Sequence, residues 1–178
     1  AKWRRTICPD FRIAVNLFPV QFKTDDLPTF IRDTLERMRL SPDGLEIEIT
    51  ESTILNSDQR ILSKLKTIRD MGVAVAFDDF GTGYASLSML RDYPVTKIKI
   101  DRSFVSGNGA DERAQLIAKC IAAMAADLDL VVVAEGIETR EQHERMRDQG
   151  CDHGQGYLYG RPMRAMDYER QARGQTSR

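Results

Sequence analysis

Apolar and polar positions alternate along the chain with two different periods, which predicts a regular succession of strands and helices. Short apolar runs typical of buried strands occupy residues 12–17, 45–50, 73–77, 96–100, 130–134 and 154–159. Between them, apolar residues recur every three or four positions, the spacing of one helical face, over residues 27–38, 56–72, 84–91, 116–128 and 139–149. We therefore expect about six strands and five helices.

Two of these helices carry N-terminal signals. Asn56 with Gln59, and Thr139 with Gln142, have the spacing of a capping box, in which each side chain bonds the backbone N–H of the other residue. Gly72 follows the first of these helices and is suited to end it.

The alternation of strands and helices predicts a parallel sheet with right-handed crossovers, either a doubly wound open sheet or a (β/α)₈ barrel. Polar residues near the carboxyl ends of the predicted strands favour the barrel, because barrel enzymes build their sites there. These residues are Asn16, Glu48, Asp78 with Asp79, Lys99 with Asp101, Glu135 and Gln155. Any one of them could simply cap a loop or face solvent. Their recurrence at six successive strand ends predicts a shared site.

Charge and composition narrow the function classes. The 178 residues are 42% hydrophobic, enough for one core, and the formal net charge is −1. No overall field therefore draws the chain to DNA, RNA or an anionic membrane, and a nucleotide ligand would need a local site. The three cysteines, Cys8, Cys120 and Cys151, have no spacing of a disulfide framework or zinc site, which favours a reducing, cytoplasmic setting. No apolar run approaches a membrane span and no signal peptide is recognisable.

The predicted site is rich in carboxylates, and this predicts metal binding. Several carboxylates gathered on one face repel one another unless divalent cations lie between them. The donors are all oxygen atoms, and His143 and His153 have no useful spacing, so Mg²⁺ or Mn²⁺ is favoured over zinc. Asp78 and Asp79 are adjacent and would point to opposite faces of an extended strand, but a turn at the strand end lets both reach the site.

The sequence allows more than one role for Lys99 and for the glycines Gly81 and Gly83. Lys99 lies on one strand face with Lys97 and Asp101, where it could orient a water or neutralise a phosphate, or simply pair with Asp101. The segment Gly81-Thr-Gly83 is too short for a dinucleotide fingerprint and lacks the lysine of a P-loop, so a tight turn explains it equally well.

Six motifs in order closely resemble the EAL domain family over about residues 1 to 165. They are Val-Asn-Leu at 15–17, Glu-Ile-Thr-Glu-Ser at 48–52, Asp-Asp-Phe-Gly-Thr-Gly-Tyr at 78–84, Lys-Ile-Asp-Arg-Ser-Phe-Val at 99–105, Ala-Glu-Gly-Ile-Glu-Thr at 134–139 and Gln-Gly-Tyr-Leu at 155–158. The resemblance implies a modified (β/α)₈ barrel that hydrolyses cyclic di-GMP to linear pGpG with two Mg²⁺ or Mn²⁺ ions.

The resemblance also implies roles for individual residues. The implied metal ligands are Asn16, Glu48, Asp78, Asp79 and Glu135. Lys99, Glu135 and Gln155 are implied to be catalytic: Lys99 would position the attacking water, Glu135 would act at the metal site, and Gln155 would contact the water or support the site. Asp101 and Glu138 are expected in support. Glu51 is implied to anchor the loop that follows Asp79, and this loop to link the site to a dimer surface.

Where the chain departs from the family pattern, further expectations arise. The Glu-Ala-Leu motif that names the family is absent, so we expect residues 1–165 to supply about six barrel strands without the opening ones, followed by a polar tail at 166–178. Phe18 and Ala85 stand where serine is usual. Without the first glutamate of the family, a receptor that binds cyclic di-GMP without cleaving it is the alternative, and a barrel lyase of the enolase or aldolase type is a third, by analogy of fold alone.

The resemblance implies the surroundings of the domain as well. We expect a cytoplasmic homodimer with no contact of its own to DNA or a membrane. Fused GGDEF, PAS or sensor domains, some of which anchor proteins to membranes, would lie outside these residues.

Overall fold

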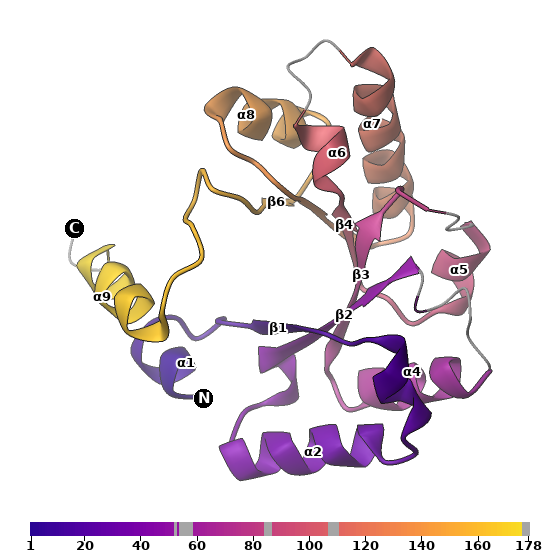
Figure 1. Ribbon diagram of the computed structural model, residues 1–178, viewed down its shortest axis with the longest axis vertical. Helices are drawn as coiled ribbons and strands as arrows, with labels where there is room; N and C mark the ends of the chain where they lie inside the picture. Colours follow the sequence, from indigo (N-terminus) through magenta and orange to yellow (C-terminus); the bar gives the residue numbers. More distant parts are fainter. Residues whose placement is uncertain (52, 54–58, 84–86, 107–110, 176–178) are drawn as a thin grey trace.

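A computed structural model describes residues 1–51, 53, 59–83, 87–106 and 111–175 of the chain. Six parallel strands form one sheet whose spatial order follows the sequence, from β1 to β6. They are β1 (Ile13–Asn16), β2 (Leu45–Thr50), β3 (Ala74–Phe80), β4 (Lys97–Ile100), β5 (Val131–Ala134) and β6 (His153–Gly154). The order never reverses, which excludes the doubly wound alternative, and the sheet curls as a half-barrel with helices on its outer face (Figure 1).

The structure contains α1 (Lys2–Thr6), α2 (Leu27–Met38), α4 (Gln59–Asp70), α5 (Leu87–Asp92), α6 (Arg102–Val105), α7 (Glu112–Asp127), α8 (Arg140–Asp148) and α9 (Ala165–Gln175), with 3₁₀ turns at Pro19–Lys23 and Pro42–Gly44. The five predicted helices correspond to α2, α4, α5, α7 and α8, whereas α1, α6 and α9 were not predicted. The capping box of α8 is confirmed: Thr139 Oγ1 accepts a hydrogen bond from Gln142 N at 3.2 Å, and Gln142 Oε1 accepts one from Thr139 N at 3.0 Å. The predicted box at Asn56 lies outside the described residues.

The main core lies between the sheet and its helices. Alternate strand residues such as Ile47, Val75 and Ile98 are fully or almost fully buried, in one cluster with Leu65 of α4 and Ala118 of α7. The strand positions between them carry the charged residues of the inner face. This alternation, with period two, places the site residues opposite the core.

The last predicted strand, 154–159, is wrong in extent. Strand β6 contains only His153–Gly154. Beyond it, Gln155 O accepts a hydrogen bond from Ile137 N at 3.0 Å, and Leu158 N donates one to Ile137 O at the same distance. A Cβ at Gly156 would clash with the backbone of Ile137. Glycine allows the chain to press against the loop after β5, so the segment bonds to that loop instead of extending β6.

Much of the segment expected as a polar tail is the helix α9, which lies beside α1 (Figure 1). Trp3 Nε1 donates a hydrogen bond to Glu169 Oε1 at 2.6 Å. The rings of Trp3, Phe11 and Tyr168 pack with centroids 5.1 to 5.8 Å apart. Residues near the two ends of the chain therefore contact each other.

No helix among the described residues is long and apolar enough to cross a membrane. All three cysteines are free thiols, Cys8 and Cys120 exposed and Cys151 buried. Burial raises the pKa of the Cys151 thiol to about 11, so this thiol is protonated at neutral pH.

Phe18 is the N-cap residue of the 3₁₀ turn Pro19–Lys23, and its side chain cannot accept a hydrogen bond. Its backbone is extended, and its N–H donates a hydrogen bond to Gln21 Oε1 at 2.8 Å, one half of a capping box. Gln21 N donates to the Phe18 carbonyl oxygen at 2.9 Å, and the phenyl ring, which is 63% exposed, offers no acceptor of its own. Phe18→Ser would add a side-chain acceptor for the first N–H groups of this turn, so we expect it to raise the free energy of unfolding by up to about 1 kcal/mol. Urea unfolding measures this, and Phe18→Ala is the control because it removes the ring without adding an oxygen.

Candidate metal centre

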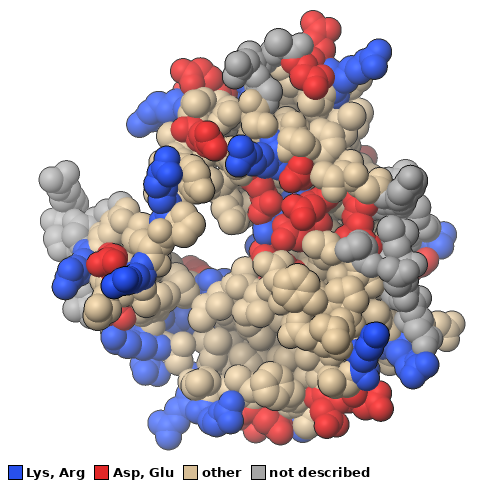
Figure 2. Space-filling model, viewed as in Figure 1, with Lys and Arg blue, Asp and Glu red and all other residues tan. Residues whose placement is uncertain are grey.

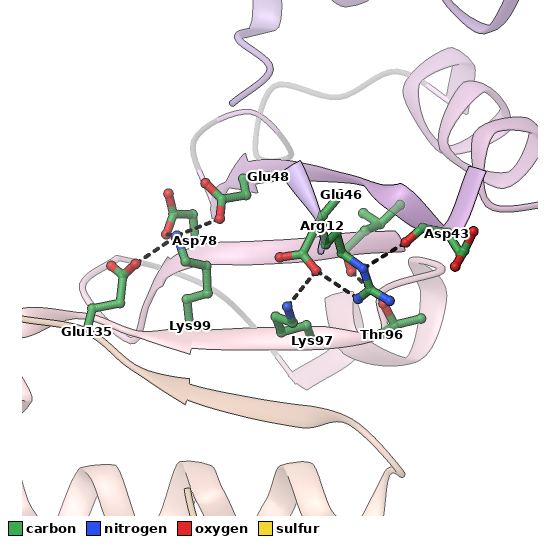
Figure 3. Close-up of polar contacts among 10 residues, drawn as sticks. Arg12, Asp43, Glu46, Glu48, Asp78, Thr96, Lys97, Lys99 and Glu135 are labelled. Atoms are coloured by element: carbon green, nitrogen blue, oxygen red, sulfur yellow. Dashed lines mark hydrogen bonds and ion pairs between the residues drawn. The ribbon is translucent and has the colours of Figure 1, made fainter. Parts of the chain in front are cut away.

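Three carboxylates converge on the ammonium group of Lys99 at the carboxyl end of the sheet (Figure 3). Lys99 Nζ lies 2.8 Å from Glu48 Oε1, 2.8 Å from Asp78 Oδ1 and 2.7 Å from Glu135 Oε1. The Lys99 side chain is only 5% exposed. An ammonium has three N–H donors, so each can serve one carboxylate. The alternative pairing of Lys99 with Asp101 is not found among the described contacts, and Asp101 instead accepts a hydrogen bond from Ser103 N at 2.9 Å.

Small residues on β3 make this convergence possible. Lys99 belongs to β4 and Glu48 to β2, so the side chains meet across the intervening strand β3. Ala76 is the Cα partner of Glu48 on one side and of Lys97 on the other. Its methyl group leaves space above β3 that a larger side chain would fill.

Asp79 reaches the same side as Asp78 because the strand is irregular at this point. The register between β3 and β4 shifts between Phe77 and Phe80, and Asp79 has a φ of 53°. In this left-handed conformation two consecutive side chains no longer alternate. One oxygen from each of Asp78, Asp79 and Glu135 lies within 4.8 Å of the others, close enough to hold a cation together.

The other predicted site residues lie around this centre at different distances. Asn16 is the Cα partner of Glu48, at the end of the edge strand β1. Gln155 lines a cavity of about 980 Å³ together with Glu48 and Lys99. Asp101 and Glu138 line a neighbouring hollow beside Glu135, and Glu138 is exposed just before α8. Figure 2 shows acidic side chains gathered in the middle of this face, beside the opening of the molecule.

Glu51 lies where an anchor for the loop after Asp79 would be needed. It is buried, and its Oε1 accepts a hydrogen bond from Gly81 N at 3.0 Å. A Cβ at Gly83 would clash with Glu51 Oε2, so a larger residue there would force the Glu51 carboxylate to shift. The structure therefore favours the tight-turn interpretation of the two glycines. Tyr84, Ala85 and Ser86 lie outside the described residues.

The electrostatics leave an excess of negative charge. Burial alone would lower the pKa of Lys99, but its hydrogen bonds to Asp78, Glu135 and Glu48 outweigh this and raise it. Burial raises the pKa of Glu135 even though Lys99 opposes the shift, and Asp78 and Glu48 raise it further. Burial also raises the pKa of Asp79, with Asp78 and Asp101 adding to the effect. One ammonium does not compensate this many carboxylates, and the oxygen donors fit Mg²⁺ or Mn²⁺.

A second charged group on the same face was not singled out from the sequence. Glu46 is buried and contacts Lys97 and Arg12. The available signal was the spacing: Glu46 and Glu48, like Lys97 and Lys99, stand two residues apart in apolar strands and so share a face.

The raised pKa values of Asp79 and Glu135 predict how pH and metal act on stability. A carboxyl whose pKa is higher in the folded than in the unfolded state stabilises the fold when protonated, and this contribution is lost as the pH rises through the folded-state pKa. We therefore expect Mn²⁺, which would compensate the charged forms, to raise the melting temperature more at about pH 7.5 than at about pH 4.5. Thermal unfolding with Mn²⁺ or with a chelator tests this. Equal shifts at both pH values would contradict it, and Asp79→Asn should reduce the difference.

The fold and the site together define a class. A curled parallel sheet with helices on its outer face, and a carboxylate-rich centre at the carboxyl ends of its strands, is an α/β protein of the barrel type with the donors of a divalent-metal site. Comparison with known proteins gives the family within this class. The EAL domain family model matches residues 1–162, and the chain belongs to this family.

Relatives and solved structures agree with this assignment. The chain is 42% identical over 156 residues to the bifunctional diguanylate cyclase/cyclic di-GMP phosphodiesterase MucR of Pseudomonas aeruginosa, covering 88% of this chain and 23% of MucR. It superposes with a TM-score of 0.86 and 40% identity on the MucR phosphodiesterase in complex with c-di-GMP, covering 94% of this chain and 72% of that one. A manganese and cyclic di-GMP complex of Klebsiella pneumoniae BlrP1 gives a TM-score of 0.80 and 33% identity, covering 86% of this chain and 39% of that one.

Proposed function

We propose that this chain is part of a phosphodiesterase that hydrolyses cyclic di-GMP to linear pGpG with two Mg²⁺ or Mn²⁺ ions. The observation that carries the proposal is the convergence of Glu48, Asp78 and Glu135 on Lys99, with Asp79 turned to the same side. The solved relatives contain cyclic di-GMP and, in one case, manganese, which supports the same ligand and metal class for this chain.

Each side chain has a distinct task in this proposal. Asn16, Glu48, Asp78, Asp79 and Glu135 supply oxygen donors that would hold the cations. When bound, such cations lower the pKa of a water molecule and offset negative charge on the attacking and leaving oxygens. Gln155 lines the same cavity as Lys99 and would contact the water through its carboxamide.

Lys99 acts as a permanent hydrogen-bond donor. Its pKa is raised by the surrounding carboxylates, so it holds its proton and does not serve as a base. With the carboxylates holding cations, N–H groups of Lys99 would be available to the attacking water or to a phosphate oxygen. Lys99 then orients the reacting atoms, with Asp101 and Glu138 lining the hollow beside Glu135.

The proposed domain comprises residues 1–165, as part of a larger barrel. Every residue of β1 is exposed, and Ile13 and Val15 are 42% and 41% exposed although they are apolar strand residues. Further strands beside this edge would cover them. We also propose a cytoplasmic protein in which other domains accompany this one, since the chain spans only 23% of the length of MucR.

Dimerisation through the loop after Asp79 is a further part of the proposal. Glu51 connects this loop to β2 through Gly81 N. We expect Glu51→Ala to lower turnover and to weaken dimerisation together, because the backbone next to Asp79 loses its buried acceptor. Turnover assays and analytical ultracentrifugation measure the two effects. Unchanged values of both would count against the coupling.

Hydrolysis of cyclic di-GMP in the presence of Mg²⁺ or Mn²⁺ tests the function. The comparison is between these 178 residues and a chain extended upstream to complete the barrel, with Glu48→Ala in the longer chain as control. Cleavage to pGpG by the longer chain, lost in the control, is the expected result. Binding without cleavage by the longer chain would instead favour a receptor.

A further inference from the structure

A second layer of charged side chains, made of Arg12, Glu46 and Lys97, lies next to the proposed metal centre, on the same inner face of the sheet (Figure 3). Glu46 Oε2 lies 2.5 Å from Lys97 Nζ and 3.3 Å from Arg12 Nη1. The Glu46 side chain is only 4% exposed and that of Lys97 16%. Arg12 Nε also donates a hydrogen bond to Asp43 O at 3.0 Å, which fixes the guanidinium at the edge of this layer.

The register of the strands shows that Glu46 is not the residue directly across from Lys97. Ala76 of β3 is the Cα partner of both Glu48 and Lys97, so these two residues stand in one row across the sheet. Glu46 is the Cα partner of Ala74, which stands two residues before Ala76 along β3. Lys97 therefore reaches diagonally back to Glu46, just as Lys99 reaches back to Glu48 two residues further along.

Glu48 consequently has two lysines that could reach it across Ala76. Lys99 contacts Glu48 at 2.8 Å, and the backbone of Lys97 stands in the same row of the sheet as Glu48. An ammonium held mostly out of water is unfavourable without a carboxylate partner. If Glu46 did not pair with Lys97, the ammonium would find its next carboxylate partner on β2 in Glu48, which faces the same cavity.

We propose that Glu46 is a positioning residue for the metal centre: it holds Lys97 away from Glu48 and so leaves the Glu48 carboxylate available to a divalent cation. This inference rests on the proposed function, because it takes Glu48 to be a metal ligand. Arg12 contributes by fixing the Glu46 carboxylate from its other side. The buried ion pair thus acts on the site through Lys97, which would otherwise be a second lysine in contact with Glu48.

Calorimetric titration of Mn²⁺ into the chain with the complete barrel measures binding and tests the inference without depending on turnover. Glu46→Gln is expected to weaken Mn²⁺ binding about tenfold or more, because Lys97 then pairs with Glu48. The double variant Glu46→Gln with Lys97→Met is expected to bind Mn²⁺ within about twofold of the wild type, because the competing ammonium is gone. Lys97→Met alone should bind like the wild type, and thermal unfolding verifies that each variant is folded.

The outcomes separate the inference from the proposed function. If the wild type binds Mn²⁺ and Glu48→Gln does not, but Glu46→Gln binds normally or the double variant stays as weak as the single one, the inference is overturned and the metal site stands. If the wild type binds no Mn²⁺, both are overturned. Should Glu46→Gln not fold, Glu46→Asp is the alternative variant, because it retracts the carboxylate by one methylene. It is expected to weaken Mn²⁺ binding less than Glu46→Gln does, and the Lys97→Met change should restore the binding. Unweakened Mn²⁺ binding by Glu46→Asp would then overturn the inference.

Discussion

Replacing Lys99 with methionine is expected to abolish most of the proposed hydrolysis of cyclic di-GMP while strengthening the binding of divalent cations. Methionine has a similar length but no charge, so the variant removes the ammonium that Glu48, Asp78 and Glu135 share. The carboxylates then attract cations without competition. The donor that orients the reacting atoms is lost, so we expect turnover to fall about a thousandfold.

The same variant has an expected signature in stability. Removing one partner of a buried ion pair leaves uncompensated charge, which costs about 3 to 5 kcal/mol in the free energy of unfolding without metal. Mn²⁺ should restore much of this loss, because it supplies the missing positive charge. Urea unfolding with Mn²⁺ and with a chelator measures both values. Lys97→Met is the control for turnover, because Lys97 pairs with Glu46 and not with these three carboxylates. Near-normal turnover of Lys99→Met would show that Lys99 only balances charge.

The second large effect is expected at Asp79, where backbone conformation and chemistry coincide. Asp79→Asn and Asp79→Ala both remove a charged donor from the cluster with Asp78 and Glu135, so both should lower turnover and Mn²⁺ affinity about a hundredfold or more. The two variants should differ in stability. Asparagine tolerates the left-handed conformation that Asp79 adopts at a φ of 53°, whereas alanine costs about 1 kcal/mol there.

Charge adds to this difference between the two variants of Asp79. Burial and the neighbouring carboxylates raise the pKa of Asp79, so its ionised form destabilises the metal-free fold at neutral pH. We therefore expect Asp79→Asn to be at least as stable as the wild type without metal, and Asp79→Ala to be less stable than Asp79→Asn. Urea unfolding of the three proteins measures the order. Equal stability of the two variants would show that the turn imposes no strain on residue 79.

Local pattern predicted the elements because it depends on few neighbours. Helix 27–38 and strand 45–50 match the structure residue for residue, since each shows a full period of apolar positions. The capping box at Thr139 required only four residues. The last strand failed because the segment after Gly154 is held by Ile137, a residue of a different loop, and no local period records such a contact.

What the sequence by itself determined is which chemistry the chain carries and at which edge of the sheet. Period-two alternation separates the buried Ile47 from the charged Glu46 and Glu48, and parallel strands bring their carboxyl ends to one side. The tertiary structure alone decided which charges meet. The shifted register and left-handed turn at Asp79, and the diagonal reach of Lys97 and Lys99 across Ala76, depend on how strands distant in the sequence are aligned. That alignment results from packing the whole sheet against its helices, so no single segment of sequence contains it.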